Sequence, residues 1–181
     1  MAKLQSTEIV GVANRPATIC SNSVCMWFDT TNLKPMASYC GCGAGTWSAG
    51  GTMITARGYL AGAGTQNAGL AAGGGAGVSC TEEYNGTSWS AGGALIIARY
   101  ALAGAGTQNE GLVFGGYVAP SVSCTEEYNG TSWSAGGALA TARYGMGDGG
   151  TQNAGLAFGG SVGGDCTQEY NKPLQIIDIC L

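Results

Sequence analysis

Histidine is absent from this chain of 181 residues, and charged side chains are scarce. Only 10% of the residues are Asp, Glu, Lys or Arg, and seven basic against eleven acidic residues give a formal net charge of −4. The lack of histidine removes the most common general base and metal ligand of proteins. Seven scattered basic residues form no positive stripe for a phosphate backbone, so nucleic-acid binding is not expected.

Long apolar runs are missing as well. No stretch of about 18 apolar residues occurs, so we expect no membrane insertion. The first residues, MAKLQSTEIVGVANRP, contain no apolar core of a signal peptide, so we expect synthesis in the cytoplasm without secretion. Glycine is abundant instead, at 34 residues, and 45% of the chain is hydrophobic. Disordered chains show the opposite balance, and this composition therefore predicts a folded protein.

An internal repeat dominates the sequence. The stretch CTEEYNGTSWSAGG occurs twice without change, at 80–93 and 124–137. Equivalent landmarks recur every 42 to 44 residues, and TQN triplets follow the same period. The landmarks are Trp47, Trp89 and Trp133; Arg57, Arg99 and Arg143; and Tyr84, Tyr128 and Tyr170.

Each repeat predicts four short strands separated by turns. In the second repeat these are IARYALAGAG before a TQN turn, GLVFGG, SCTEEY before an Asn-Gly turn, and TSWSAGGAL. No apolar period of 3.6 persists long enough for a helix, so the predicted class is all-β. Four strands in about 40–45 residues are typical of a β-propeller blade.

The order of arginine, double glycine, tyrosine with a turn, and tryptophan resembles the kelch family. That resemblance implies a small kelch-like β-propeller, a single domain over residues 1–181. We predict four blades of four antiparallel strands, near 1–54, 55–97, 98–141 and 142–181. In the degenerate first blade the strands would be TEIVGVAN, VCMWFDTT, KPMASYC and TWSAGGTM, and LQIIDICL would complete the last blade. The alternative is an incomplete array that closes by association of chains.

The cysteines do not form a recognisable metal site. Cys80, Cys124 and Cys166 recur on one strand position, too far apart for disulfides, and are predicted to be buried free thiols. The spacing of the other group matches no common zinc module, and either free thiols or one local disulfide fits it. This group comprises Cys20, Cys25, Cys40 and Cys42. We expect no metal, no cofactor and no catalytic residue.

The repeated charged and aromatic residues are interpreted as structural. In a strand, Glu82 and Glu83 point to opposite faces, so they cannot act together on a substrate. We expect such glutamates to pair with Arg99 or Arg143, and these arginines to bind a glutamate or carbonyl groups between blades. The tryptophans are expected in the core between blades.

One loop varies in length between the repeats. The double glycine precedes the repeated cysteine by six residues in the first and third copies and by eight in the second. The longer loop, YVAPSVS, is a candidate binding loop because scaffolds keep their length while binding loops vary. Its candidate residues are Tyr117, Val118, Pro120 and Ser121, and a neutral insertion is the alternative.

The segment MWFDTTNLKPMASYCGCGAGTWSAGG resembles a segment common in phage tail-fibre and other virion proteins, although the cysteines of YCGCG depart from it. This resemblance implies a non-enzymatic virion protein in the tail, a fibre or the capsid surface. Its expected partners are other virion proteins, host-surface glycan or protein, and further copies of itself. The alternatives are a cellular kelch module that binds proteins and a small propeller enzyme. The enzyme lacks both a histidine and a converging acid pair.

Overall fold

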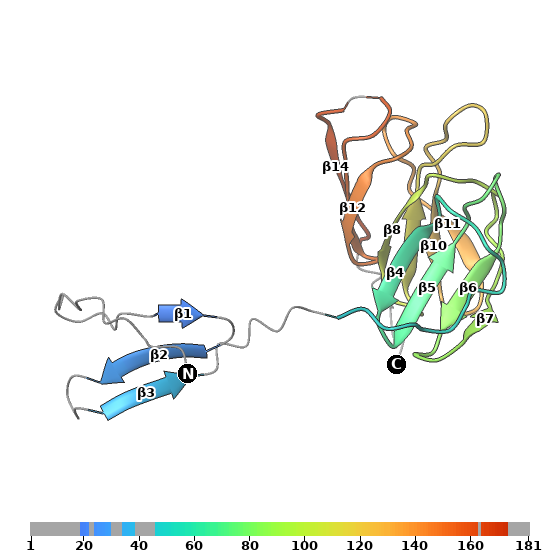
Figure 1. The fold of residues 1–181 in the computed structure, drawn as a ribbon. Coiled ribbons are helices and arrows are strands. Elements are labelled where there is room, and N and C mark those ends of the chain that lie inside the picture. Colours follow the sequence, from blue (N-terminus) through green and yellow to red (C-terminus); the bar gives the residue numbers. More distant parts are fainter. Residues whose placement is uncertain (1–18, 22–23, 30–33, 39–45, 163, 174–181) are drawn as a thin grey trace, which may run out of the picture. The chain divides into compact units, whose positions relative to one another are not determined.

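The structure of the chain is a computed structural model that describes residues 19–21, 24–29, 34–38, 46–162 and 164–173. Two compact units divide the chain, Met1–Ser48 and Ala49–Leu181 (Figure 1). Every secondary-structure element of the described residues is a strand, which confirms the all-β class. None of these residues belongs to a helix able to cross a membrane.

The N-terminal unit contains one antiparallel sheet in the order β1-β2-β3. Its strands are β1 (Ile19–Ser21), β2 (Val24–Asp29) and β3 (Lys34–Ser38). The strands predicted in VCMWFDTT and KPMASYC are therefore confirmed. The stretch TEIVGVAN lies outside the described residues, and TWSAGGTM forms no strand where it is described.

The second unit contains three antiparallel sheets, each formed by consecutive strands (Figure 1). Sheet I comprises β4 (Ala61–Thr65), β5 (Ala68–Ala72), β6 (Thr81–Tyr84) and β7 (Trp89–Ala91). Sheet II comprises β8 (Ala103–Gly106), β9 (Gly111–Phe114), β10 (Thr125–Tyr128) and β11 (Trp133–Gly136). Sheet III comprises β12 (Gly147–Gly150), β13 (Ala154–Phe158) and β14 (Thr167–Asn171). The predicted four strands per repeat are thus confirmed for sheets I and II.

The repeated asparagine organises the turn between the third and fourth strands. The Asn85 side-chain oxygen accepts hydrogen bonds from the backbone N–H groups of Thr87 and Ser88, at 3.0 and 2.9 Å. Gly86 follows with φ of 91°, a left-handed conformation that glycine adopts without strain. This turn sets the register that pairs Tyr84 with Trp89.

Small residues let neighbouring sheets approach at their first strands. The strands β4 and β8 are in contact, as are β8 and β12. A Cβ atom on Gly104 would lie 2.9 Å from the Cβ of Ala61, closer than real Cβ atoms come. Gly104 is therefore required by the packing of β8 on β4.

Leucine on one sheet packs on glycine of the next sheet. Leu70 is 3% exposed, and a Cβ atom on Gly111 would lie 2.5 Å from its Cδ2. Leu112 is fully buried, and a Cβ on Gly155 would lie 2.6 Å from its Cδ2. The core is thus repeated between successive sheets.

Sheet III has three described strands, and the predicted strand LQIIDICL lies outside the described residues. The single domain, the blade boundaries and the count of four blades therefore stay predictions.

Candidate functional site

The loop predicted as a binding loop is anchored at both ends. The Tyr117 N–H donates to the Tyr100 carbonyl at 2.8 Å, and the Tyr100 N–H donates back at 3.3 Å. The Val122 N–H donates to the Gly116 carbonyl at 2.9 Å. Between these anchors Val118 is 44% exposed. The loop therefore holds a fixed backbone and presents its tip to solvent.

Its remaining candidates lie at the same tip. Pro120 is exposed beside Val118, and its carbonyl accepts the Val118 N–H at 3.2 Å. Ser121 is partly buried and forms an isolated β-bridge with Tyr117. The structure thus brings all four predicted residues together.

Tyr117 belongs to a row of four tyrosines, which we call the tyrosine strip: Tyr59, Tyr100, Tyr117 and Tyr144. Successive ring centroids lie 6.5, 5.5 and 5.2 Å apart in that order. Tyr59 is 76% exposed and Tyr144 38%, while the two central tyrosines are partly buried. Edge-to-face and tilted ring contacts of this kind stabilise a fixed arrangement. The strip is therefore an ordered aromatic surface rather than a set of separate exposed rings.

Tyr59 adopts a backbone conformation that suits glycine better. Its φ is 54°, and the residues at the equivalent position are Ala101 with φ of 51° and Gly145 with φ of 63°. Backbone hydrogen bonds fix this geometry, because Ala101 N–H donates to the Tyr59 carbonyl at 2.8 Å and Gly145 N–H to the Ala101 carbonyl at 2.9 Å. A left-handed conformation costs a residue with a side chain about 1–2 kcal/mol. The first repeat thus keeps a bulky ring where the third repeat has glycine.

Sequence reasoning identified only Tyr117 of the strip. The signal for the others was available, because Tyr100 and Tyr144 directly follow the repeated arginines. Tyr59 follows Arg57 by two positions and therefore fell outside the strict repeat. Its proximity to Tyr100 depends on the contact between sheets and could not be read from spacing.

The side chains of the repeated arginines are buried. Arg57 Nη1 donates to Glu82 Oε1 at 2.8 Å, and Arg99 Nη2 lies 3.1 Å from Glu126 Oε1. Each glutamate also accepts two backbone N–H groups from the segment before the arginine, such as Ile96 and Ile97 at Glu126. The carboxylate therefore ties the segment that enters a sheet to the third strand of that sheet.

Arg143 differs because the third repeat has Gln168 in place of the glutamate. Its Nη1 donates to the carbonyls of Gly159 and Cys166 at 3.1 and 3.0 Å. The side-chain oxygen of Gln168 accepts only the Ala140 N–H, at 2.8 Å. The expected partners, a glutamate or carbonyls, are thus present for both Arg99 and Arg143.

Their location corrects one expectation. Glu126 pairs with Arg99, one of the two expected partners, whereas Glu82 pairs with Arg57 instead of Arg99 or Arg143. The contacts lie within one repeat instead of between repeats. The arginine precedes the first strand of its sheet, so its side chain reaches the third strand of the same sheet.

Contacts between sheets use the second glutamate of each pair and a tyrosine. The Tyr128 hydroxyl donates to Glu83 Oε1 at 2.6 Å, and the Tyr170 hydroxyl donates to Glu127. Burial and these hydrogen bonds raise the pKa of both tyrosines. Burial alone would raise the pKa of Glu127, but hydrogen bonds from Lys172 and Tyr170 lower it below its ordinary value. These carboxylates are engaged in the scaffold.

Trp133 confirms the expected place of a tryptophan between sheets. Its Nε1–H donates to Thr81 Oγ1 and to the Gly93 carbonyl, both at 3.0 Å and both in the preceding repeat. Trp133 is 7% exposed. Trp89 is partly buried and packs on Tyr84, with the two ring centroids 5.0 Å apart. The prediction is wrong for Trp47, which lies in the N-terminal unit, belongs to no strand and is fully exposed.

The repeated cysteines are free thiols, but the prediction that they are buried is wrong. Cys80 and Cys166 are exposed and Cys124 is intermediate. Their recurrence reflects the backbone, because each cysteine carbonyl accepts the N–H of the first glycine in the double glycine, as Cys124 does from Gly115 at 3.0 Å. The structure describes no side chain for the other five cysteines, which are Cys20, Cys25, Cys40, Cys42 and Cys180.

Metal binding is not indicated in the described part of the chain. No group of three or more potential metal ligands occurs there. Comparison with models of protein families finds no match, and comparison with curated proteins finds none. The features of the chain that bear on function are therefore the tyrosine strip and its scaffold.

Proposed function

We propose that the chain is a non-enzymatic structural protein of a phage virion that binds a neutral saccharide on the host surface. Its sheets would be blades of a kelch-like β-propeller, either four in one chain or an incomplete array that closes by association. The location is the tail, a fibre or the capsid surface, and the partners are other virion proteins. The virion setting rests on the resemblance of Met26–Gly51 to phage proteins.

The tyrosine strip is the observation that carries the saccharide proposal. Ordered exposed aromatic rings provide flat apolar contact area with a hydroxyl at the edge, which suits ligands that are both apolar and hydroxylated. The arginines that flank the strip in sequence are buried, two of them against glutamates. These arginines therefore add no exposed positive charge to the rings and hydroxyls of the strip, and this favours a neutral ligand.

Retention of Tyr59 in a left-handed conformation supports a binding role. Strained residues of this kind concentrate at functional sites, where the surrounding structure holds them. Packing alone gives no reason for a tyrosine there, since the third repeat has Gly145 at that position. Exposure of 76% leaves most of the ring free to contact a ligand.

The scaffold supports the non-enzymatic part of the proposal. Glu82 and Glu126 are paired with arginines, and Glu83 and Glu127 accept tyrosine hydroxyls. An acid–base mechanism needs a pair of groups that converge on a substrate with separated pKa values. These four carboxylates are divided between two faces of their strands.

A glycan panel probed with the full-length chain tests the proposal. We expect binding of neutral oligosaccharides that is lost in Tyr117→Ala and retained in Ile96→Ala, which removes exposed apolar surface outside the strip. Far-UV circular dichroism confirms that each variant is folded. Absence of binding to every glycan, or equal binding by both variants, would remove the saccharide role. Binding to a host protein through the same tyrosines would instead favour the kelch interaction module.

A further inference from the structure

The third repeat lacks the tryptophan that closes the other two. In sheets I and II the fourth strand begins with a tryptophan five positions after the repeated tyrosine, as Trp133 follows Tyr128. Five positions after Tyr170 the residue is Gln175. Sheet III is described with β14 at its edge, where the fourth strand pairs in the other sheets.

Trp133 shows which groups surround the tryptophan of a fourth strand, and we call these groups the socket. Its indole N–H donates to a threonine hydroxyl and a glycine carbonyl of the preceding repeat, Thr81 and Gly93. Its ring packs on the tyrosine of its own sheet, Tyr128, with centroids 4.7 Å apart. Threonine, glycine and tyrosine thus define the socket.

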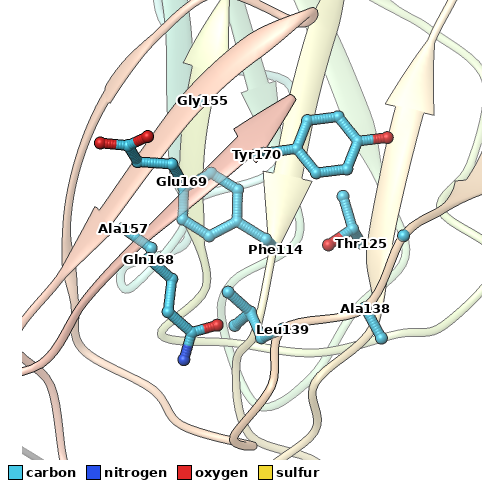
Figure 2. A pocket seen from close by; sticks show the side chains of 10 residues that line it. Phe114, Thr125, Ala138, Leu139, Gly155, Ala157, Gln168, Glu169 and Tyr170 are labelled. Carbon is cyan, nitrogen blue, oxygen red and sulfur yellow. The ribbon is translucent and has the colours of Figure 1, made fainter. Parts of the chain in front are cut away.

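The same three residue types line a pocket one repeat further on. The pocket lies between sheets II and III, has a volume of about 310 Å³ including its opening to solvent, and is lined by Thr125, Gly137 and Tyr170 among others (Figure 2). Thr125, Gly137 and Tyr170 are the equivalents of Thr81, Gly93 and Tyr128. Figure 2 shows the Thr125 and Tyr170 side chains beside the ring of Phe114 at the pocket. The pocket is therefore a tryptophan socket without a described occupant.

Trp47 belongs to the repeated segment that contains Trp89 and Trp133, but its side chain is exposed. It begins the sequence WSAGG, which is also found at Trp89 and Trp133, and it precedes Arg57 by the same ten residues. Trp47 is nevertheless fully exposed, whereas Trp133 is 7% exposed. The segment that contains it is equivalent to β7 and β11, the strands that pair with the third strand of a sheet.

The contact between successive sheets needs a leucine on one sheet and a glycine on the next. The two ends of the array each have one of these residues. Leu156 is equivalent to the buried Leu112 but is 37% exposed. Gly69 is equivalent to Gly111 and Gly155, but the three atoms nearest to the site of its Cβ belong to Tyr84, Thr65 and Trp89 of its own repeat. Sheet III thus presents a leucine and sheet I presents the glycine that receives one.

The polar groups at these ends are complementary in the same way. Gln108 donates to the carbonyls of Gly69 and Tyr84 in the preceding sheet, at 3.1 and 2.7 Å, and Gln152 repeats this contact. The equivalent donor at the front of the array is Gln66, which is exposed. At the back, the exposed Glu169 is equivalent to Glu127, which accepts a tyrosine hydroxyl.

We propose that these ends bind one another between two copies of the chain. Residues 46–51 of one copy add a fourth strand to β14 of the other, and Trp47 fills the socket at Thr125 and Gly137. That strand leads directly into sheet I, so sheet I of the first copy then packs on Leu156 of the second. β-Propellers typically have about four to eight blades, so sheets I to III cannot close a ring alone. Two copies provide six such sheets, and a two-fold axis gives each copy one strand to donate and one socket.

Mass measurement on the full-length chain tests this arrangement. Light scattering after size exclusion should give twice the 18.0 kDa of one chain for the wild type. We expect single chains for Trp47→Ala, which removes the inserted ring, and for Ala138→Arg, which fills the socket from an exposed position. Ala135→Arg, an exposed substitution on β11 outside the socket lining, is the control and should remain paired.

Two further measurements distinguish loss of the Trp47 insertion from a general loss of association. An equal mixture of Trp47→Ala and Ala138→Arg restores one intact contact, because one chain keeps the socket and the other keeps the tryptophan, and the paired mass should return. Gly69→Ala should leave folding unchanged but raise the dissociation constant at least tenfold, since its methyl group meets Leu156 of the partner.

Other masses decide against the proposal. A wild type that stays a single chain at micromolar concentration overturns it, and blue-shifted tryptophan fluorescence lost in Trp47→Ala would then indicate closure within one chain. A complex of three or more chains overturns the two-copy ring. Trp47→Ala that keeps the wild-type mass overturns the inserted strand.

Discussion

Arg99 and Glu126 form a buried ion pair, with Nη2 3.1 Å from Oε1 and side chains that are 0% and 2% exposed. Removal of one partner from such a pair leaves a buried charge without compensation, which costs about 3–5 kcal/mol. We therefore expect Arg99→Ala to lower the free energy of unfolding by about this amount in urea titrations.

Two other basic residues of the array, Arg143 and Lys172, provide a graded comparison. Arg143→Ala removes hydrogen bonds to two carbonyls and should cost more than about 1.4 kcal/mol, a tenfold change in the folding equilibrium. Lys172→Ala breaks a partly exposed pair with Glu127 and should cost less than about 1 kcal/mol. Equal effects of all three substitutions would contradict the structural role of the arginines.

Glycine at the contact between sheets should be intolerant of a methyl group. Gly111→Ala and Gly155→Ala would each place Cβ within 2.6 Å of a buried leucine Cδ2. Overpacking of this kind typically costs about 1–3 kcal/mol, so both variants should show lower unfolding midpoints. Gly62→Ala, whose Cβ would meet only a carbonyl at 3.9 Å, is the matched control. The prediction fails if Gly62→Ala destabilises as much as Gly111→Ala.

Tyr59 should show opposite effects on binding and stability. Tyr59→Gly relieves the left-handed strain of about 1–2 kcal/mol, and the greater chain entropy of unfolded glycine offsets about 0.5–1 kcal/mol of that gain. We expect an unfolding free energy equal to or above that of the wild type, together with loss of saccharide binding. Calorimetric unfolding and a binding titration on the same sample measure both. A clear loss of stability would show that Tyr59 is retained for packing.

Acid should weaken the contact between sheets II and III. The pKa of Glu127 is lowered in the folded protein, because the hydrogen bonds from Lys172 and Tyr170 outweigh the effect of burial. A carboxyl with a lowered folded pKa stabilises the fold above its unfolded pKa, and this contribution is lost as the pH falls through the folded value. Urea midpoints between neutral pH and about pH 3 should therefore fall less steeply in Glu127→Gln than in the wild type. Identical slopes would contradict this assignment.

The strands and turns could be predicted from the sequence, but the pairing of side chains between them could not. The landmarks at Arg99, Tyr128 and Trp133 located strands and turns because their offsets are constant. Which arginine meets which glutamate could not be derived, since a period of 42 to 44 residues is satisfied equally by partners in the same or the next repeat.

The exposure of the cysteines and the tyrosine strip were missed for a related reason. A residue can recur because its carbonyl is needed, as at Cys124, and its side chain then carries no information. Tyr59 joins the strip from outside the strict repeat, through a backbone conformation that a letter pattern does not encode. Both features depend on geometry around the backbone rather than on residue type.

The leucine-to-glycine contact has a consequence for how such a chain can change length. Leu70 meets Gly111 as Leu112 meets Gly155, so the front of each sheet accepts the back of any other. A duplication of one period inside the gene would add a sheet whose two faces already fit their new neighbours, with no further substitution. The unaltered copies of CTEEYNGTSWSAGG are what such growth would leave behind, and the array is in this sense a polymer whose monomers share one backbone.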